Sequence, residues 1–232
     1  MKVTQKWAIL TTVALLSCGA MVFGGYLYFT AKISIPSRDE LEGKADLQVF
    51  YDKALNYESL ISEKPAELQN YLALGGAWKL IGDNTKDRRW HKLSLNAYER
   101  GIEITNRRNS VLLTNAGHIE EQLGNYAEAK KYYSEAIDLS PGDVNYYLMY
   151  INLLRYKTKA STDEILSVYE RGMERVLGGA DLISNRSQYF KAIGRYADAR
   201  RDLELLLTNN VITQQQMDSE LLEMKKLEEA AN

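Results

Sequence analysis

The sequence predicts an all-α fold made of helical hairpins laid side by side. One short phrase occurs twice, at 125–129 and at 195–199, and a glycine precedes each copy. The copies lie two periods of about 35 residues apart, a spacing typical of stacked helical repeats. Only three prolines interrupt the 232 residues, and sixteen tyrosines favour helices that pack through aromatic side chains.

Charge and cysteine content exclude several classes of function. The 31 acidic and 29 basic residues nearly cancel, and a nucleic-acid partner would need clustered positive charge. Cys18 is the only cysteine, so neither an intrachain disulfide nor a cysteine-based metal cluster is expected.

Residues 7–31 predict a transmembrane helix. This stretch contains no charged residue, and as a helix it would extend about 37 Å, enough to cross a hydrocarbon core of about 30 Å. Trp7 at one end and Tyr26 and Tyr28 at the other suit the two membrane interfaces. Residues 1–6 would then be a short cytoplasmic tail and 32–36 a linker.

Two processed forms of this segment compete with a permanent anchor. Leu15–Cys18 resembles the lipobox of bacterial lipoproteins, whose cysteine is lipidated, and Cys18–Ala20 is compatible with a signal-peptide cleavage site. Lysine and arginine are balanced on the two sides and do not decide the orientation. The short charged tail resembles a bacterial signal anchor, which implies an inner-membrane protein with its C-terminal domain on the periplasmic side.

The first soluble element is a leading helix at 37–64. Ser37 and Glu40 have the spacing of a capping box, which predicts a helix start. Apolar residues then recur at steps of three and four until Pro65 ends the pattern.

The clearest hairpin runs from Ser110 to Asp143. Gly124 is placed to end its first helix in a left-handed conformation, and Asn125 opens the second. Small residues at Gly117 and Ala129 would let the two helices come close.

This unit resembles the tetratricopeptide repeat (TPR) family. Six positions have the family spacing: Gly117, Gly124, Ala129, Tyr133, Ala136 and Pro141. Only the aromatic residue expected in the first helix is missing, since Glu120 stands there. The resemblance implies a right-handed α-solenoid of about four hairpins over 65–210. One neighbouring unit carries about seven extra residues near 84–90, and another about two near 158–162.

Residues 211–232 predict a C-terminal capping helix. Thr213 and Gln216 have capping-box spacing, and Met217, Leu221 and Met224 form an apolar seam. That seam is too short to favour the alternative of a coiled coil.

No catalytic, cofactor or metal site is expected. The two histidines, His91 and His118, lie in different units without metal-ligand partners at helical spacing. The adjacent carboxylates Glu120 and Glu121 are interpreted as part of a solvated face. No small-molecule substrate is expected either.

The resemblance implies instead a groove lined by the first helix of each unit, which binds a protein or peptide partner. The residues predicted to line this groove are Lys79, His118, Gln122, Asn152, Arg155, Gln188 and Lys191. They are polar and mildly basic, which suits an acidic or C-terminal segment of the partner. The lysine/asparagine clamp of some family members is not reproduced, because Gly76 replaces an asparagine. A second candidate patch, for contact with phosphates, lipid headgroups or nucleic acid, is Arg88–Lys92 with Arg107 and Arg108. The competing interpretation is that Trp90 packs on its own unit.

The sequence thus predicts a membrane-anchored scaffold or adaptor for other proteins. The family resemblance implies a role in bacterial envelope assembly, secretion or quality control. The alternative is a fixed structural subunit of a larger membrane-bound machine.

Overall fold

The computed structural model describes residues 34–231, which form α-helices, one 3-10 turn and no strand. The predicted tail at 1–6, the predicted membrane helix at 7–31 and the start of the linker lie outside the described residues. Among the helices of 34–231, none is both long and apolar enough to cross a membrane. Contacts divide the chain into two units, Met1–Glu40 and Leu41–Asn232, and all the α-helices below belong to the second.

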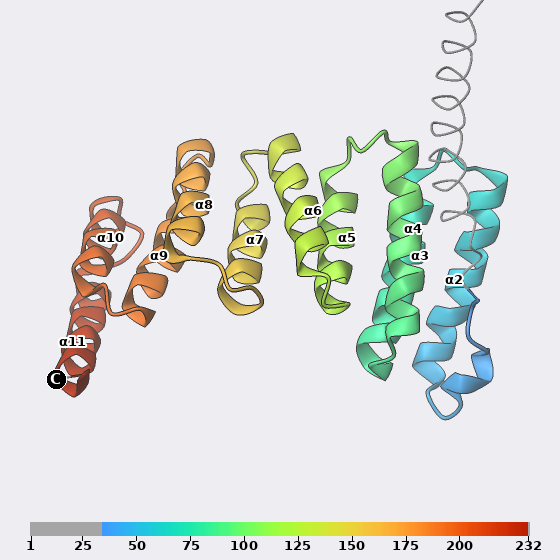
Figure 1. Cartoon of the computed structure of the whole chain (residues 1–232), viewed down its shortest axis with the longest axis horizontal. Helices are drawn as coiled ribbons and strands as arrows, with labels where there is room; N and C mark the ends of the chain where they lie inside the picture. Colours follow the sequence, from blue (N-terminus) through green and yellow to red (C-terminus); the bar gives the residue numbers. More distant parts are fainter. Residues whose placement is uncertain (1–33, 232) are drawn as a thin grey trace, which may run out of the picture. The chain divides into compact units, whose positions relative to one another are not determined.

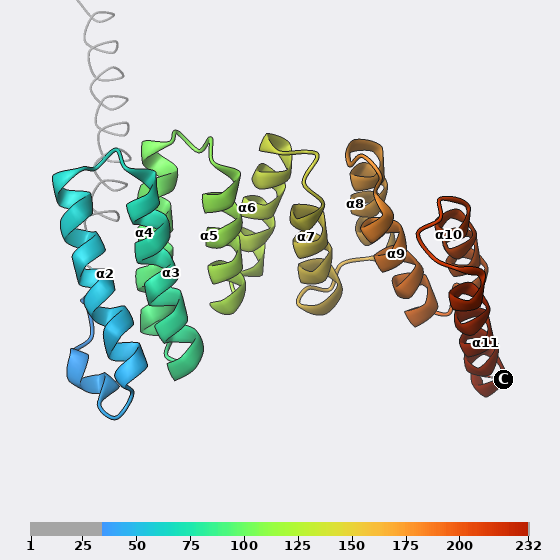
Figure 2. The same cartoon turned by 180° about the vertical axis from the view of Figure 1, so that it is seen from behind.

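The second unit consists of four helical hairpins with one further helix at each end. Its helices stand side by side in chain order (Figures 1 and 2), and consecutive helices pack on each other. The 3-10 turn η1 (Arg38–Leu41) precedes these helices at the boundary of the two units. The helices are α2 (Ala45–Glu63), α3 (Leu68–Thr85), α4 (Arg88–Ile104), α5 (Ser110–Gln122), α6 (Tyr126–Leu139), α7 (Val144–Tyr156), α8 (Thr162–Arg175), α9 (Ala180–Ala192), α10 (Tyr196–Thr208) and α11 (Gln214–Ala231). The predicted all-α row of hairpins is confirmed.

The leading helix starts later than predicted. Glu40 does accept a hydrogen bond from the Ser37 backbone N–H at 3.3 Å, as in a capping box. That contact closes only the 3-10 turn η1, because Gly43 follows with a φ of +76°, a conformation that ends the turn and favours glycine. The predicted start at residue 37 is therefore wrong, and α2 begins at Ala45.

Glycines that face tyrosine rings set how closely the helices of a hairpin approach. A Cβ atom added at Gly75 would lie 2.3 Å from Cε1 of Tyr98. At Gly117 it would lie 3.0 Å from the ring of Tyr133. Since nonbonded carbon atoms normally stay at least 3.5 Å apart, each tyrosine occupies space that only glycine leaves open. The predicted close approach at Gly117 is confirmed.

Tyrosine hydroxyls also tie the repeats to the preceding turns. Tyr71 donates a hydrogen bond to the carbonyl oxygen of Pro65 at 2.9 Å, and Tyr147 donates one to that of Pro141 at 3.0 Å. The same contact occurs at equivalent places in two units. It satisfies a buried phenol and a turn carbonyl together.

The extra residues near 84–90 do not form the inserted turn that the sequence suggested. They lengthen α3 and α4 instead, and the connection shrinks to Lys86 and Asp87. Trp90 lies in α4 and is 1% exposed. Its ring stacks on Trp78 with centroids 5.5 Å apart, so it has the packing role that was the competing interpretation of the second patch.

Three arginines of that second patch, Arg88, Arg89 and Arg107, have internal partners. Arg88 donates to the carbonyl oxygen of Leu123, and Arg89 pairs with Asp87. Arg107 pairs with Glu135 at 2.7 Å. Arg88 and Arg107 therefore link neighbouring hairpins.

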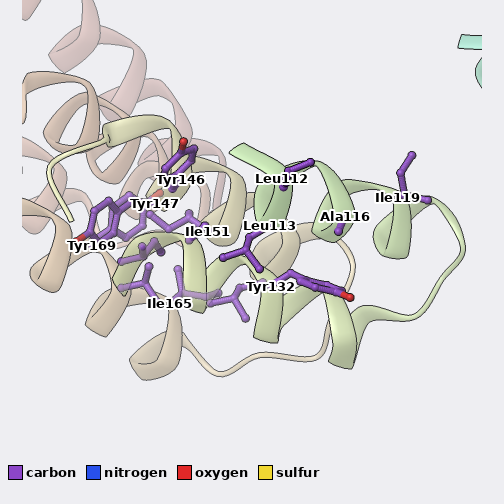
Figure 3. Close-up of a cluster of buried hydrophobic side chains, with 14 of the residues drawn as sticks. Leu112, Leu113, Ala116, Ile119, Tyr132, Tyr146, Tyr147, Ile151, Ile165 and Tyr169 are labelled. Carbon is purple, nitrogen blue, oxygen red and sulfur yellow. The ribbon is translucent and has the colours of Figure 1, made fainter. Parts of the chain in front are cut away.

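The main core runs through several hairpins without a break. Figure 3 shows side chains from α5 to α8 converging on one another. The labelled members are Leu112, Leu113, Ala116, Ile119, Tyr132, Tyr146, Tyr147, Ile151, Ile165 and Tyr169. Because each hairpin buries its apolar face against the next one, neighbouring repeats are needed for stability.

Ion pairs link successive even-numbered helices. Glu58 of α2 pairs with Arg100 of α4 at 2.8 Å. Further along, α6 and α8 are joined by Lys130 with Glu164 and by Asp138 with Arg171. These pairs are partly exposed, so each contributes about 0–1 kcal/mol.

The C-terminal helix follows its predicted start. The side chain of Gln216 accepts a hydrogen bond from the Thr213 backbone N–H at 2.8 Å, and Thr213 Oγ1 accepts one from the Gln216 N–H at 3.3 Å. These reciprocal contacts confirm the capping box. Met217 and Met224 are buried with Leu203 and Leu206 of α10 in a separate core cluster.

Glu120 differs from its predicted place on a solvated face. Its side chain is 7% exposed and accepts a hydrogen bond from Asn125 Nδ2 at 2.7 Å. Burial raises the pKa of this carboxyl, and Asn125 only partly offsets that effect. A carboxylate thus stands where the family has an aromatic residue, which costs stability when it is ionised.

We expect Gly75→Ala to destabilise the protein by about 2 kcal/mol, because the new methyl displaces the Tyr98 ring from a packed core. Gly76→Ala in the same helix is the matched control, since its Cβ would lie 4.0 Å from Tyr98 Oη. The control gains helix propensity and should be stabilised by up to about 1 kcal/mol. Urea denaturation followed by far-UV circular dichroism measures both. Equal effects of the two substitutions would contradict the proposed role of the glycine.

We expect Glu120→Gln to stabilise the protein near pH 8 by about 1 kcal/mol, the usual scale of a single substitution. A carboxyl whose folded-state pKa is raised destabilises the fold as pH rises above its unfolded value, so the gain should vanish below about pH 4. Denaturation midpoints across this pH range provide the measurement. The exposed control Glu170→Gln on α8 should show no such trend with pH, and a pH-independent gain for Glu120→Gln would count against the assignment.

Candidate functional site

The seven predicted groove residues lie on the odd-numbered helices, one or two to a helix. Lys79 is on α3, His118 and Gln122 on α5, Asn152 and Arg155 on α7, and Gln188 and Lys191 on α9. His118, Asn152 and Gln188 occupy equivalent places in their helices. Chain order and helix packing therefore distribute the set along the row of hairpins.

Lys79 belongs to a polar cluster that joins α3 and α4. Asp83 accepts from Lys79 Nζ at 2.6 Å and lies 3.0 Å from His91 Nε2. Burial acts to raise the pKa of Asp83, but the hydrogen bonds from Lys79 and His91 lower it on balance. The Lys79 charge is thus neutralised within the protein.

His118 lies near this cluster and is half-buried. Burial, together with the charge of Lys79, lowers the pKa of its imidazole. The ring is therefore neutral at pH 7. Within 34–231 no group of three or more histidine, cysteine or acidic side chains is arranged to hold a metal ion.

Arg155 connects α7 to α9. Its Nη1 donates to Asn185 Oδ1 at 3.3 Å and to Tyr169 Oη at 3.4 Å. The guanidinium also lies 4.9 Å from the ring centroids of both Tyr156 and Tyr189. Burial raises the pKa of Tyr169 to about 12, so that phenol keeps its proton.

Lys191 connects α9 to the C-terminal helix. Its Nζ lies 2.8 Å from Glu220 and 3.0 Å from Glu223 of α11. Burial acts to lower the pKa of Lys191, and the two glutamates raise it on balance. A second cation of the predicted groove is therefore neutralised internally.

A cavity of about 350 Å³ lies between α9, α10 and α11. Gln188 lines it together with serine and glutamine side chains, above Leu203 and Leu206. The cavity is thus an uncharged polar recess at the end of the row, apart from Glu220, which Lys191 neutralises.

Gln122, Asn152 and Gln188 are exposed, and none of their side chains has a hydrogen-bond partner in the part of the chain that the structure describes. The structure brings Lys79 close to His118, and Arg155 close to the helix that carries Gln188. It does not join Gln122 or Asn152 to the other members by a hydrogen bond. The basic character predicted for the groove is concentrated at Arg155.

Sequence reasoning missed several residues at this surface. Glu220 and Glu223 neutralise Lys191 from another helix. Asp83 neutralises Lys79 from the next turn of the same helix, and the i,i+4 spacing was a signal for that pair. Tyr156 is 65% exposed, and its place directly after Arg155 was the one signal available. Tyr189 reaches the site only because α9 packs on α7.

One family model matches a part of the chain. The family model described as "Tetratricopeptide repeat" matches residues 111–143. No curated protein matches the sequence.

Solved structures match the fold over most of their length. A crystal structure of MamA has a TM-score of 0.54 at 15% identity and covers 77% of this chain and 96% of its own. A second MamA structure has a TM-score of 0.53 at 15% identity, with coverages of 74% and 86%. YrrB, described as a TPR protein with an unusual peptide-binding site, has a TM-score of 0.51 at 14% identity, with coverages of 80% and 88%. Residues 111–143 are therefore a tetratricopeptide repeat, and the described chain around them has the fold of a TPR-like helical solenoid.

Proposed function

We propose that this protein is a scaffold that binds a protein or peptide partner on the side chains of its odd-numbered helices. The observation that carries the proposal is the row of exposed carboxamides Gln122, Asn152 and Gln188, which have no partner in the described residues. Exposed polar groups without internal partners can exchange water for a bound chain at little cost. The peptide-binding site in the description of YrrB supports this choice by analogy. The proposal includes no catalytic or cofactor role.

We further propose that residues 7–31 anchor the scaffold in a membrane, with the helical domain on the periplasmic side of a bacterial inner membrane. The support is the uncharged run itself, with Trp7 and Tyr26 near its ends. A short linker at 32–36 would then hold the solenoid near the bilayer. The partner would be another membrane or envelope protein, in assembly, secretion or quality control.

Photo-crosslinking of the full-length protein in cells tests the binding surface. We expect benzoylphenylalanine in place of Asn152 to give a discrete crosslinked product. The same residue in place of Glu170, an exposed position of α8, should give none, because the even-numbered helices are not the proposed surface. Crosslinking at Glu170 but not at Asn152 would contradict the proposal.

Membrane extraction and protease accessibility test the anchor. We expect the full chain to stay in the membrane pellet after alkaline carbonate treatment and to be released when residues 2–33 are deleted. Protease added to spheroplasts should digest the helical domain. A domain protected in spheroplasts and cleaved only after lysis would show the opposite orientation.

A further inference from the structure

The guanidinium of Arg155 is held in one orientation by neutral groups alone. Its plane lies near the rings of Tyr156 and Tyr189, and Nη1 alone makes the two hydrogen bonds described above. An arginine side chain carries five N–H donors. The donors of Nε and Nη2 therefore remain available to a group outside the protein.

No acidic side chain of the described residues pairs with Arg155, in contrast to a neighbouring arginine. Arg186 of α9 makes a two-point contact with Asp202, from Nε at 2.9 Å and from Nη2 at 2.6 Å. Lys79 and Lys191 likewise have carboxylate partners. Among the cations predicted for the groove, Arg155 is thus the one without a carboxylate partner in the described residues, and its charge can pair with an acidic group of a ligand.

The surroundings of Arg155 have the composition of a binding hot spot. Tyr156 is 65% exposed although it packs beside the guanidinium, whereas Tyr189 is 6% exposed and forms the floor. Arginine and tyrosine are enriched among the residues that contribute most to protein interfaces. A partner that covers Tyr156 would also exclude water from the Arg155 charge and strengthen any ion pair made there.

Two exposed carboxamides lie one helical turn from Arg155 or from its partner Asn185. Asn152 lies one turn before Arg155 on α7, where residues three apart are neighbours. Gln188 is likewise three residues from Asn185, which accepts the hydrogen bond from Arg155. A carboxamide offers one donor group beside one acceptor, as a peptide group does. An extended chain leaves its peptide groups open to such pairing, whereas a helix uses them internally.

We propose that Arg155 receives an acidic side chain of an extended partner segment, and that Asn152 and Gln188 hold the main chain of that segment. This inference rests on the proposed function and names its partner class. The bond is a charge-assisted pair between carboxylate and guanidinium, which is stronger than a neutral hydrogen bond. Specificity for the acid comes from Arg155, and the carboxamides bind irrespective of sequence.

Selection of random dodecapeptides displayed on phage tests the inference with the full-length protein in mild detergent. We expect the wild-type protein to enrich Asp or Glu at one fixed position. Arg155→Ala should abolish that enrichment and weaken the binding of the selected peptides about tenfold or more. Lys157→Ala removes the same charge from an exposed residue two positions away and is the matched control.

A second pair of variants separates binding from folding. Asn152→Ala changes only an exposed side chain and should weaken acidic and neutral peptides alike, by about three- to tenfold. Arg155→Lys keeps the charge but loses the planar fork, so it should retain acid preference with reduced affinity. Circular dichroism should show native helix content for every variant.

Three results would overturn the inference. They are acid enrichment that persists in Arg155→Ala, selected peptides without an acidic position, and failure to select any peptide. In each case the scaffold function is judged separately by the in-cell crosslinking at Asn152, which needs no peptide. A crosslink there without acid preference would leave a scaffold whose partner is recognised in another way.

Discussion

Contact between glycine and tyrosine is the constraint on which the rest of the structure depends. Tyr98 and Tyr133 occupy the space that a Cβ atom would fill at Gly75 and Gly117. At the other end of a hairpin, Gly172 faces the ring of Tyr147 in the same way. The helices of a hairpin can therefore approach closely, and the ring fixes both the distance and the register between them. Once that register is fixed, equivalent residues of successive hairpins lie at equivalent places, either all on odd-numbered helices or all on even-numbered helices.

This register determines the chemistry of the surface. The odd-numbered helices present His118, Asn152 and Gln188 at equivalent places, while the even-numbered helices are linked to each other by ion pairs. Two of the cations predicted for the groove are paired within the protein, Lys79 with Asp83 and Lys191 with Glu220. A surface neutralised in this way does not attract every acidic chain, so recognition depends on the few groups that remain available.

The repeats and their ends could be predicted from the sequence because they depend on local signals. The caps at Gly124 and at Thr213, with a positive φ at the first and reciprocal hydrogen bonds at the second, involve residues only a few positions apart. The placement of the predicted groove residues on the odd-numbered helices followed from the same periodicity. The buried state of Glu120 and the carboxylate partners of the groove lysines were missed. The burial of Glu120 and the glutamate partners of Lys191 depend on how one helix packs against another, and a single sequence does not show which side chains meet there. Lys79 and Asp83 are four residues apart on one helix, where side chains are neighbours, so this pair could have been found from the sequence.

The ion pairs between even-numbered helices stop at α8, and this has a consequence for how the row responds to solvent. The α2–α4 and α6–α8 junctions are bridged by charges, and Arg107, just beyond α4, bridges to α6. In the described residues the junction between α8 and α9 relies on neutral contacts such as that of Tyr169 with Asn185. Added electrolyte screens exposed charges and leaves neutral contacts nearly untouched. High ionic strength would therefore weaken the three junctions bridged by charges and leave the α8–α9 junction nearly unchanged.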